Sequence, residues 1–476
     1  MRRPVVRVQS RGKEAGVVSV VMKFGGTSVA DEAAIRRVAA IVRAQIDRDA
    51  PTGGRAPVVV VSALSKVTDG LLQVAVLMER GERDQALVRL EDLEDRHVTL
   101  AAALASGARL AAVTRDLAAE FSQLSGLVRA IASLHEVSPR LRDAVAAAGE
   151  LASSRLVAAA LGEAGIPAVW VDARDVVVTD DEYTSAAPDL SATCRRAAAV
   201  LAPIVERGEV PVMGGFIGAT PEGVTTTLGR GGSDYSASII GACLGVSEIQ
   251  IWTDVDGMLT ADPRVVPNPR LVPQLSFAEA SELAYFGAKV LHPSTILPAV
   301  SKNIPVRILN SRRPEAPGTL ITASPQASNG TLTALACKRD VTVIDITSTR
   351  MFMAYGFLRR VFEVFERCKT PVDVVTTSEV SVSVTVDDPR RLDPILEQLR
   401  TFAEVSHERD MAIICAVGED LHDDPTAFAR AVSALEAIPL RMVSQAASRR
   451  NITFVMRDTD APGAMRRLHD AFFGAS

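Results

Sequence analysis

The chain has 476 residues, of which 47% are hydrophobic, and its formal net charge is −5. This length and apolar content predict a globular protein of several domains and exclude a disordered chain. The acidic balance argues against a nucleic-acid-binding protein with a broad basic face. No apolar run reaches membrane-spanning length, and residues 1–18 are expected to form a flexible extension that lacks the apolar run of a signal peptide.

The cysteines and histidines are scattered and show neither a CxxC pair nor metal-binding spacing. We interpret the cysteines as thiols of a reducing environment rather than as a disulfide framework or a zinc site. They are Cys194, Cys243, Cys337, Cys368 and Cys415. The expected localisation is therefore cytoplasmic, with neither a membrane nor a nucleic acid as partner.

Apolar strands and helices alternate along residues 19–310. The strands are expected at 19–24, 57–61, 167–172, 210–218, 248–254 and 304–309, and an amphipathic helix is expected over 276–291. A run such as Val58–Val61 is typical of a strand that is covered on both faces in a parallel sheet. Residues 70–135 show helical spacing without a strand, which predicts an excursion of about three helices. The predicted fold of residues 19–310 is an α/β domain with a parallel sheet between helices.

Polar and glycine residues follow several of these strands. Ligands of parallel sheets bind beyond the carboxyl ends of the strands. At or just after such ends lie Lys23, Ser62, Gly214–Gly215, Arg230 and Thr253–Asp254. This shared position predicts that all of them belong to a single site.

Residues 225–236 read TTTLGRGGSDYS, a strand end followed by a glycine-rich loop around Arg230 and then a helix. Ser233 or Asp234 is expected to cap that helix. Such a turn offers backbone N–H groups, a helix N-terminus and a guanidinium to a multiply charged anion. The alternative is a tight strand-to-helix turn without a ligand.

Two further stretches can likewise be interpreted either as ligand-binding or as purely structural. Lys23 ends a strand and precedes Gly25-Gly26 and a helix capped by Asp31, which favours phosphate binding, although a solvated lysine at a strand end is the alternative. Glu150 is expected in the first turn of a helix that opens near Ala148. A carboxylate there favours the helix dipole even without a ligand.

The last third of the chain has a different organisation. Residues 311–330 are rich in Pro, Gly, Ser and Ala and are expected to form a linker. Two βαββαβ-like units follow at 331–409 and 410–476, and a strand from 331–338 is expected to complete the second unit. No acid/base cluster stands out in them, which favours a binding or regulatory role.

The motifs KFGGTS at 23–28 and TTLGRGGSD at 226–234 together resemble those of the aspartate kinases, members of the amino-acid kinase family. Supporting stretches are GEL at 149–151, WTDVDG at 252–257, DPR at 262–264 and FGAKVLHP at 286–293. The resemblance runs from residue 20 to the C-terminus. It implies an αβα-sandwich kinase domain followed by two ACT-like domains, as in the monofunctional, lysine-sensitive, homo-oligomeric class.

The resemblance also implies an activity, namely phosphorylation of the L-aspartate β-carboxylate by ATP. It implies that Lys23 contacts the ATP phosphates and that Asp234 organises the reacting centre or Mg²⁺, which comes with ATP because no direct metal motif is present. Arg230 and Glu150 are expected to bind the carboxylate and the ammonium group of aspartate. Residues expected to orient aspartate are Thr68, Ser233 and Ser62. Residues expected to hold the nucleotide are Gly25, Gly26, Thr253, Asp254, Arg264, Lys289 and Val290.

The resemblance further implies feedback inhibition by lysine and a homodimer or homotetramer formed through the ACT-like domains. The positions that resemble the lysine site are Met351, Phe357, Leu358, Val372, Asp373, Thr377, Ser378 and Glu379. At these positions the alternative is a dimer interface without an effector. For the whole chain, the alternatives are a kinase of the same family acting on glutamate or acetylglutamate, and a non-catalytic amino-acid sensor.

Overall fold

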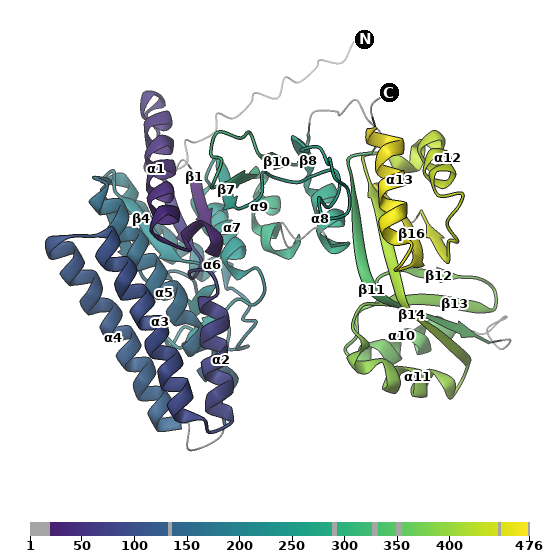
Figure 1. Ribbon diagram of the computed structural model, residues 1–476, viewed down its shortest axis with the longest axis horizontal. Coiled ribbons are helices and arrows are strands. Elements are labelled where there is room, and N and C mark those ends of the chain that lie inside the picture. Colours follow the sequence, from purple (N-terminus) through teal and green to yellow (C-terminus); the bar gives the residue numbers. More distant parts are fainter. Residues whose placement is uncertain are drawn as a thin grey trace, which may run out of the picture. The chain divides into compact units, whose positions relative to one another are not determined.

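The structure is a computed structural model that describes residues 20–131, 136–287, 293–325, 332–348, 355–445 and 449–474 (Figure 1). The chain divides into two compact units. The first contains the described residues up to Asp256 together with Ser294–Ala323, and the second contains the segment from Gly257 to Pro293 and the chain from Ser324 onward.

A mostly parallel sheet forms the centre of the first unit. Its strands lie in the order β3-β4-β2-β1-β7-β9-β10. Their bounds are β1 Val20–Phe24, β2 Val58–Val61, β3 Ala168–Val171, β4 Val210–Gly214, β7 Glu248–Thr253, β9 Val306–Asn310 and β10 Thr319–Thr322. All neighbouring pairs from β3 to β9 are parallel, and β10 is antiparallel to β9. A short hairpin of β5 (Ile217–Ala219) and β6 (Thr225–Thr227) stands apart from this sheet.

Helices cover both faces of this sheet, as predicted. Their bounds are α1 Glu32–Asp49, α2 Val67–Glu79, α3 Arg83–Leu104, α4 Gly107–Ile131, α5 Pro139–Glu163, α6 Leu190–Glu206, α7 Gly232–Leu244 and α9 Leu297–Lys302. Helix α7 packs on β1, β2 and β7, and α6 and α9 pack on α7. Helix α1 begins at the predicted cap, because the Asp31 carboxylate accepts a hydrogen bond from the Ala34 N–H.

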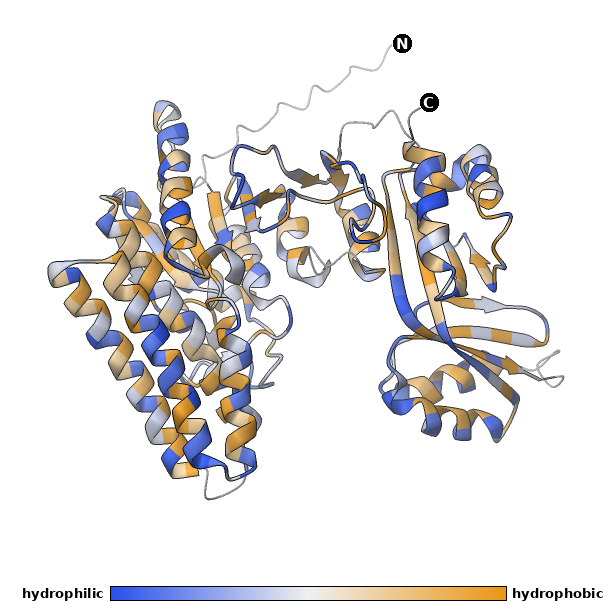
Figure 2. Ribbon diagram, in the orientation of Figure 1, coloured by the Kyte–Doolittle hydropathy of each residue, from blue (hydrophilic) through white to orange (hydrophobic). Residues whose placement is uncertain are grey.

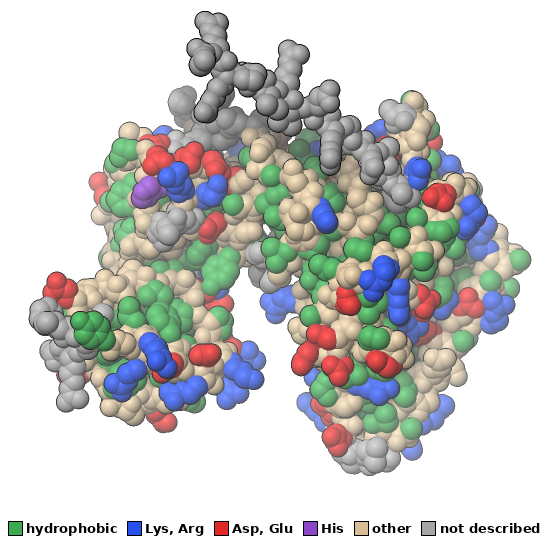
Figure 3. Space-filling view, turned by 180° about the vertical axis from the view of Figure 1, so that it is seen from behind, with side chains coloured by type: hydrophobic (Ala, Val, Ile, Leu, Met, Phe, Trp, Pro, Cys, Tyr) green, Lys and Arg blue, Asp and Glu red, His purple; other side chains and the backbone are tan. Residues whose placement is uncertain are grey.

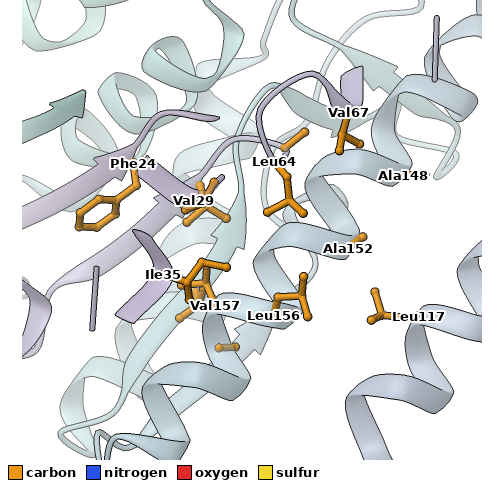
Figure 4. Packing of buried hydrophobic residues seen from close by; sticks show 14 of the residues in the cluster. Phe24, Val29, Ile35, Leu64, Val67, Leu117, Ala148, Ala152, Leu156 and Val157 are labelled. Carbon is orange, nitrogen blue, oxygen red and sulfur yellow. The ribbon is translucent and has the colours of Figure 1, made fainter. Parts of the chain in front are cut away.

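The main hydrophobic core lies between the sheet, α1 and α5 (Figure 4). Phe24 of β1, Ile35 of α1 and Leu156 of α5 are fully buried in it. Because side chains alternate across a strand, Lys23 points to the other face of β1, where α7 lies. The helix that completes this core, α5, is long and apolar enough to cross a membrane, but 83% of its most apolar window is buried inside the protein. We therefore identify α5 as a core helix.

The predicted helical excursion consists of α2, α3 and α4, which pack on one another and on α5 (Figure 1). Each of these helices presents an apolar stripe, visible as orange bands beside blue ones in Figure 2. In α3 the buried residues Ala86, Leu90, Leu93 and Leu104 recur at helical spacing.

On the molecular face in Figure 3, basic and acidic side chains are interspersed, so that face carries no broad basic surface.

The second unit is built on a sheet with the order β12-β13-β11-β14-β16-β15. The strand bounds are β11 Ala334–Thr347, β12 Val375–Thr377, β13 Ser381–Val386, β14 Glu404–Val417, β15 Met442–Ser444 and β16 Asn451–Arg457. The helices are α8 Phe277–Tyr285, α10 Phe357–Arg367, α11 Leu392–Arg400, α12 Pro425–Ala434 and α13 Ala461–Phe473. A further short strand, β8, spans Gln274–Ser276.

Two long strands, β11 and β14, run through two separate hydrophobic cores of the second unit. One core contains Ile344 and Ile346 of β11 with α10 and α11, and the other contains Leu335 of β11 and Ile414 of β14 with α12 and α13. The β11–β14 register shifts between Lys338 and Val343, close to two aspartates with positive φ, Asp340 and Asp410. Residues 334–338 of β11 pair with 413–417 of β14, on the side of the sheet that holds β16.

Three sequence predictions about the fold are wrong. The predicted linker 311–330 contains β10, which pairs with β9; the β-branched residues of its Thr-Leu-Ile-Thr sequence favour a strand. The helix expected over 276–291 is α8, which ends at Tyr285; its start at Ser276 is fixed by a capping box with Glu279. In the third case, Cys194 and Cys243 form a disulfide with a Cα–Cα distance of 4.6 Å. Packing of α6 on α7 brings these two cysteines together, whereas Cys337, Cys368 and Cys415 are free thiols.

Candidate active site

The carboxyl ends of four neighbouring strands meet at one edge of the first sheet. Lys23 pairs with Val60, Val61 pairs with Gly214, and Phe24 pairs with both Val61 and Trp252. Backbone hydrogen bonds continue past the strand ends, from the Ser62 N–H to Phe24 and from the Gly215 N–H to Val61. The loops that leave these ends surround a cavity of about 900 Å³.

The glycine-rich loop forms one wall of this cavity. Gly229 and Gly231 adopt left-handed backbone conformations with φ of 74° and 72°, which side-chain-bearing residues rarely adopt. Gly231 is the N-cap of α7, so the prediction that Ser233 or Asp234 caps the helix is wrong. Because neither side chain is used as a cap, both Ser233 and Asp234 lie in the first turn and line the cavity.

Lys23 and Asp234 form an ion pair inside the site. The Lys23 Nζ lies 2.7 Å from the Asp234 Oδ1, and the two side chains are only 10% and 15% exposed. The pair joins the end of β1 to the first turn of α7, which lies on the same face of the sheet as the Lys23 side chain. An ammonium group is therefore held next to the glycine-rich loop, at the positive end of a helix. This combination favours phosphate groups.

Glu150 is the most unusual ionisable residue of the cavity. It lies in the middle of α5 rather than in a first turn, so the helix-dipole interpretation is wrong. Its side chain is buried, and its Oε1 accepts a hydrogen bond of 3.2 Å from the Ala63 N–H. Oε2 is buried without a hydrogen-bond partner among the described residues. Burial raises the pKa of Glu150 to about 8, although the Ala63 N–H and the charge of Lys23 both lower it.

Most of the predicted site residues of the first unit line this one cavity. They are Lys23, Gly25, Gly26, Ser62, Thr68, Glu150, Arg230, Ser233, Asp234, Thr253 and Asp254. Arg264 belongs to the second unit, where its guanidinium is exposed and paired with Asp262. Lys289 and Val290 lie outside the described residues.

Sequence reasoning missed several residues of the cavity wall. The most informative of these are Lys66, Arg142, Asp143, Thr184 and Phe216. Asp143 precedes Glu150 by seven residues, which is two helical turns, so it lies on the same face of α5. This spacing was visible in the sequence once Glu150 was assigned to the interior of a helix. Thr184 and Phe216 gave no such signal, because they come from loops.

The predicted effector residues lie in the second unit and differ in exposure. Phe357 is buried in the core around α10, whereas Leu358, Thr377, Ser378 and Glu379 are exposed. The Asp373 carboxylate binds the Lys338 ammonium group at 2.8 Å and accepts a hydrogen bond from the Tyr285 hydroxyl. Val372 is half-buried, and Met351 lies outside the described residues.

The described residues contain no group of three or more His, Cys, Asp or Glu side chains arranged to hold a metal ion. Mg²⁺ in phosphoryl-transfer sites is usually held by one or two carboxylates, the substrate phosphates and water. Single carboxylates such as Asp234 and Asp254 on the cavity wall fit this mode of binding.

Comparison with known proteins defines the class. Residues 19–310 match the model of the amino acid kinase family, and residues 414–472 match an ACT domain model. The family match extends over the segment from Gly257 to Pro293, although that segment packs with the second unit. The molecule is therefore an amino acid kinase with an ACT domain at its C-terminal end.

Individual relatives narrow this class. Aspartokinase 3, chloroplastic, from Arabidopsis thaliana is 38% identical over 96% of this chain and 82% of its own length. Lysine-sensitive aspartokinase 3 from Escherichia coli is 37% identical over 95% of this chain and 99% of its own. The crystal structure of E. coli aspartokinase III in complex with aspartate and ADP (R-state) superposes with a TM-score of 0.81 at 36% identity, covering 96% of this chain and 100% of that one. The chain belongs to the aspartokinases of the amino acid kinase family.

Proposed function

We propose that this protein transfers the γ-phosphoryl group of ATP to the β-carboxylate of L-aspartate, giving ADP and 4-phospho-L-aspartate. One observation carries the proposal: a single cavity contains a lysine ammonium group, an arginine on a glycine-rich loop and the buried carboxylate of Glu150. One oxygen of this carboxylate has no hydrogen-bond partner among the described residues. These groups complement a nucleotide phosphate, a carboxylate and an α-ammonium group. A substrate with one amino group and two carboxylates fits this set.

The chemistry requires no general base. The pKa of an aspartate side chain is about 4, so the attacking carboxylate is already an anion at neutral pH. The main obstacle is to bring this anion against the phosphate groups and hold it in line with the leaving oxygen. Lys23 and the positive N-terminal end of α7 stabilise the charge of the transferring group, and removal of one such donor costs about 3–4 kcal/mol in typical enzymes.

The remaining cavity residues divide between the two substrates. Arg230 binds a carboxylate of aspartate in bidentate fashion, and Glu150 accepts hydrogen bonds from its ammonium group. Thr68, Ser62 and Ser233 orient the same substrate. Gly25, Gly26, Thr253 and Asp254 contact the nucleotide. When bound, Mg²⁺ neutralises charge on the ATP phosphates, and Asp234 and Asp254 are the carboxylates that would hold it.

Steady-state kinetics test this assignment. ADP release is measured with ATP, Mg²⁺ and one of L-aspartate, L-glutamate or N-acetyl-L-glutamate. We expect turnover with aspartate alone and release of an acyl phosphate that hydroxylamine traps. Turnover with N-acetylglutamate and none with aspartate would overturn the proposal, because Glu150 would then face an amide instead of an ammonium group.

We also propose inhibition by lysine, for which the E. coli relative's description as lysine-sensitive is the support. The Asp373 Oδ2 is buried without a hydrogen-bond partner among the described residues, and we expect the ammonium group of a bound lysine to supply one. Millimolar lysine is expected to inhibit the enzyme, and Glu379→Ala is expected to relieve this inhibition. The control is Glu363→Ala on α10, which removes a surface ion pair with Arg359. Failure of lysine to inhibit the wild-type enzyme would exclude lysine as effector.

The biological setting completes the proposal. The product is expected to enter lysine, threonine and methionine biosynthesis. The protein is expected to be a homodimer or homotetramer associated through the ACT-like domains. Light scattering with and without lysine measures the mass of the assembly, and a monomer under both conditions would contradict this expectation.

A further inference from the structure

Strained backbone is concentrated around the cavity. Three non-glycine residues that line it have positive φ, namely Lys66 at 67°, Thr184 at 71° and Phe216 at 66°. This conformation is unfavourable for side-chain-bearing residues, and it is most unusual for a β-branched residue such as Thr184. Such a conformation persists only where the surrounding structure imposes it. The contacts of Thr184 therefore show what imposes it here.

Asp143 of α5 holds Thr184 by its backbone. The Asp143 Oδ2 accepts hydrogen bonds from the Thr184 N–H at 2.9 Å and from the Thr227 N–H at 3.0 Å. The other oxygen, Oδ1, accepts a hydrogen bond of 2.7 Å from the Thr227 hydroxyl. The residue is only 1% exposed, so one buried carboxylate joins a loop to the last residue of β6.

The loop held by Asp143 supports the glycine-rich turn. The Ala186 N–H donates to the Thr227 carbonyl at 2.9 Å, which ties residues 184–186 to β6. A Cβ atom at Gly229 would lie 3.3 Å from both the Thr184 carbonyl oxygen and the Ser185 hydroxyl oxygen. The loop thus packs directly against Gly229, the residue before Arg230. A shift of Thr184 would therefore move the backbone at Gly229 and, with it, Arg230.

We infer that Asp143 is a positioning residue for the aspartate side of the cavity: it fixes residues 184–186 and Thr227 and thereby the place of Arg230. It acts through these backbone groups and not by contact with the reacting atoms. The inference rests on the proposed function, because it assigns to Arg230 the binding of aspartate.

Two substitutions at Asp143 separate hydrogen bonding from charge. Asp143→Ala removes all three hydrogen bonds. Asp143→Asn can retain them, because its amide oxygen accepts from both N–H groups and its NH₂ group donates to the Thr227 hydroxyl. We expect the alanine variant to raise the KM for aspartate about 10- to 100-fold, with the KM for ATP within about twofold of the wild type. The asparagine variant is expected to stay within about threefold for both substrates.

Asp189→Ala serves as the matched control. The Asp189 carboxylate caps α6 by accepting a hydrogen bond from the Ala192 N–H, and the residue lies outside the cavity. Its loss lowers stability without a change in either KM. If Asp143→Ala changes both KM values equally, lowers only the amount of active enzyme, or resembles Asp143→Asn, the inference is overturned.

A second variant keeps the test decisive if Asp143→Ala does not fold. Thr227→Val removes only the hydroxyl contact to Asp143 and is expected to raise the KM for aspartate about three- to tenfold, again with little change for ATP. Thr193→Val, which removes a buried hydroxyl contact to Val178, is the control. An unchanged KM for aspartate in Thr227→Val would overturn the inference. Wild-type enzyme inactive on aspartate would instead refute the proposed function, so the two failures are distinguishable.

Discussion

Replacement of Glu150 by Gln tests whether the negative charge of this residue is needed to bind aspartate. The variant keeps the shape of the side chain and removes its ability to ionise. If the Glu150 carboxylate pairs with the substrate ammonium group in a buried site, the loss of that charge costs about 3–5 kcal/mol. This corresponds to a decrease of roughly 10²- to 10⁴-fold in kcat/KM for aspartate. The KM for ATP is expected to change little.

The pKa of Glu150 adds a pH dependence that the variant lacks. With a pKa of about 8 in the free enzyme, roughly a tenth of the molecules are ionised at pH 7 and half at pH 8. Because only the ionised form binds the ammonium group, wild-type kcat/KM for aspartate is expected to rise about fivefold between pH 7 and pH 8. The Gln variant is expected to show no such rise. A coupled assay of ADP release over this pH range measures both profiles.

The same substitution has an opposite effect on stability. The pKa of Glu150 is higher in the folded than in the unfolded protein, so its contribution to stability is complete below pH 4.5 and is lost as the pH rises through about 8. A shift from 4.5 to about 8 corresponds to about 5 kcal/mol at most. We therefore expect Glu150→Gln to be more stable than the wild type at pH 9 in urea unfolding, and about equal at pH 5.

Glu163→Gln is the matched control, because Glu163 ends the same helix and its exposed side chain pairs with Arg109. This variant is expected to leave kcat/KM and its pH profile unchanged. A rise with pH in Glu150→Gln equal to that of the wild type would refute the assignment of the titrating group. A stability loss at pH 9 in Glu150→Gln would refute the buried-charge reasoning.

Three further predictions concern other parts of the first unit. Lys23→Met is expected to lower turnover by orders of magnitude and, by leaving Asp234 unpaired, to reduce stability by about 3–5 kcal/mol; near-normal turnover would remove Lys23 from the site. Arg230→Ala is expected to raise the KM for aspartate far more than the KM for ATP, and an equal rise would contradict its assignment. Thiol titration of the non-reduced, denatured protein is expected to find three thiols, and Cys194→Ser is expected to cost about 2–4 kcal/mol of stability under non-reducing conditions only. Five thiols would refute the disulfide.

The parallel sheet and much of its site were predictable because strand ends are a local signal. Lys23 and Asp254 lie at or just after the ends of the apolar strands β1 and β7, and parallel strands bring their carboxyl ends together. Arg230 instead follows β6, a strand of the separate antiparallel hairpin, and its prediction depended on the glycine-rich loop. The Lys23–Asp234 pair was not predictable in its geometry, because it depends on Gly231 as the N-cap of α7. A left-handed glycine and a serine or aspartate cap fit this sequence equally well.

Features that depend on packing between distant segments were missed. Asp143 contacts Thr184 and Thr227 across 41 and 84 residues of sequence, and these contacts follow no periodic pattern. The disulfide joins residues 49 positions apart, on two helices whose packing the sequence does not specify. The expected helix start near Ala148 is also wrong, because α5 begins at Pro139, eleven residues before Glu150.

The two long strands of the second unit have a consequence for its evolution and engineering. Each of β11 and β14 contributes side chains to both cores, and the backbone between those parts is continuous. Neither core can therefore be removed without cutting both strands. We therefore expect a chimaera of this region to fold only when both ACT-like halves are exchanged together.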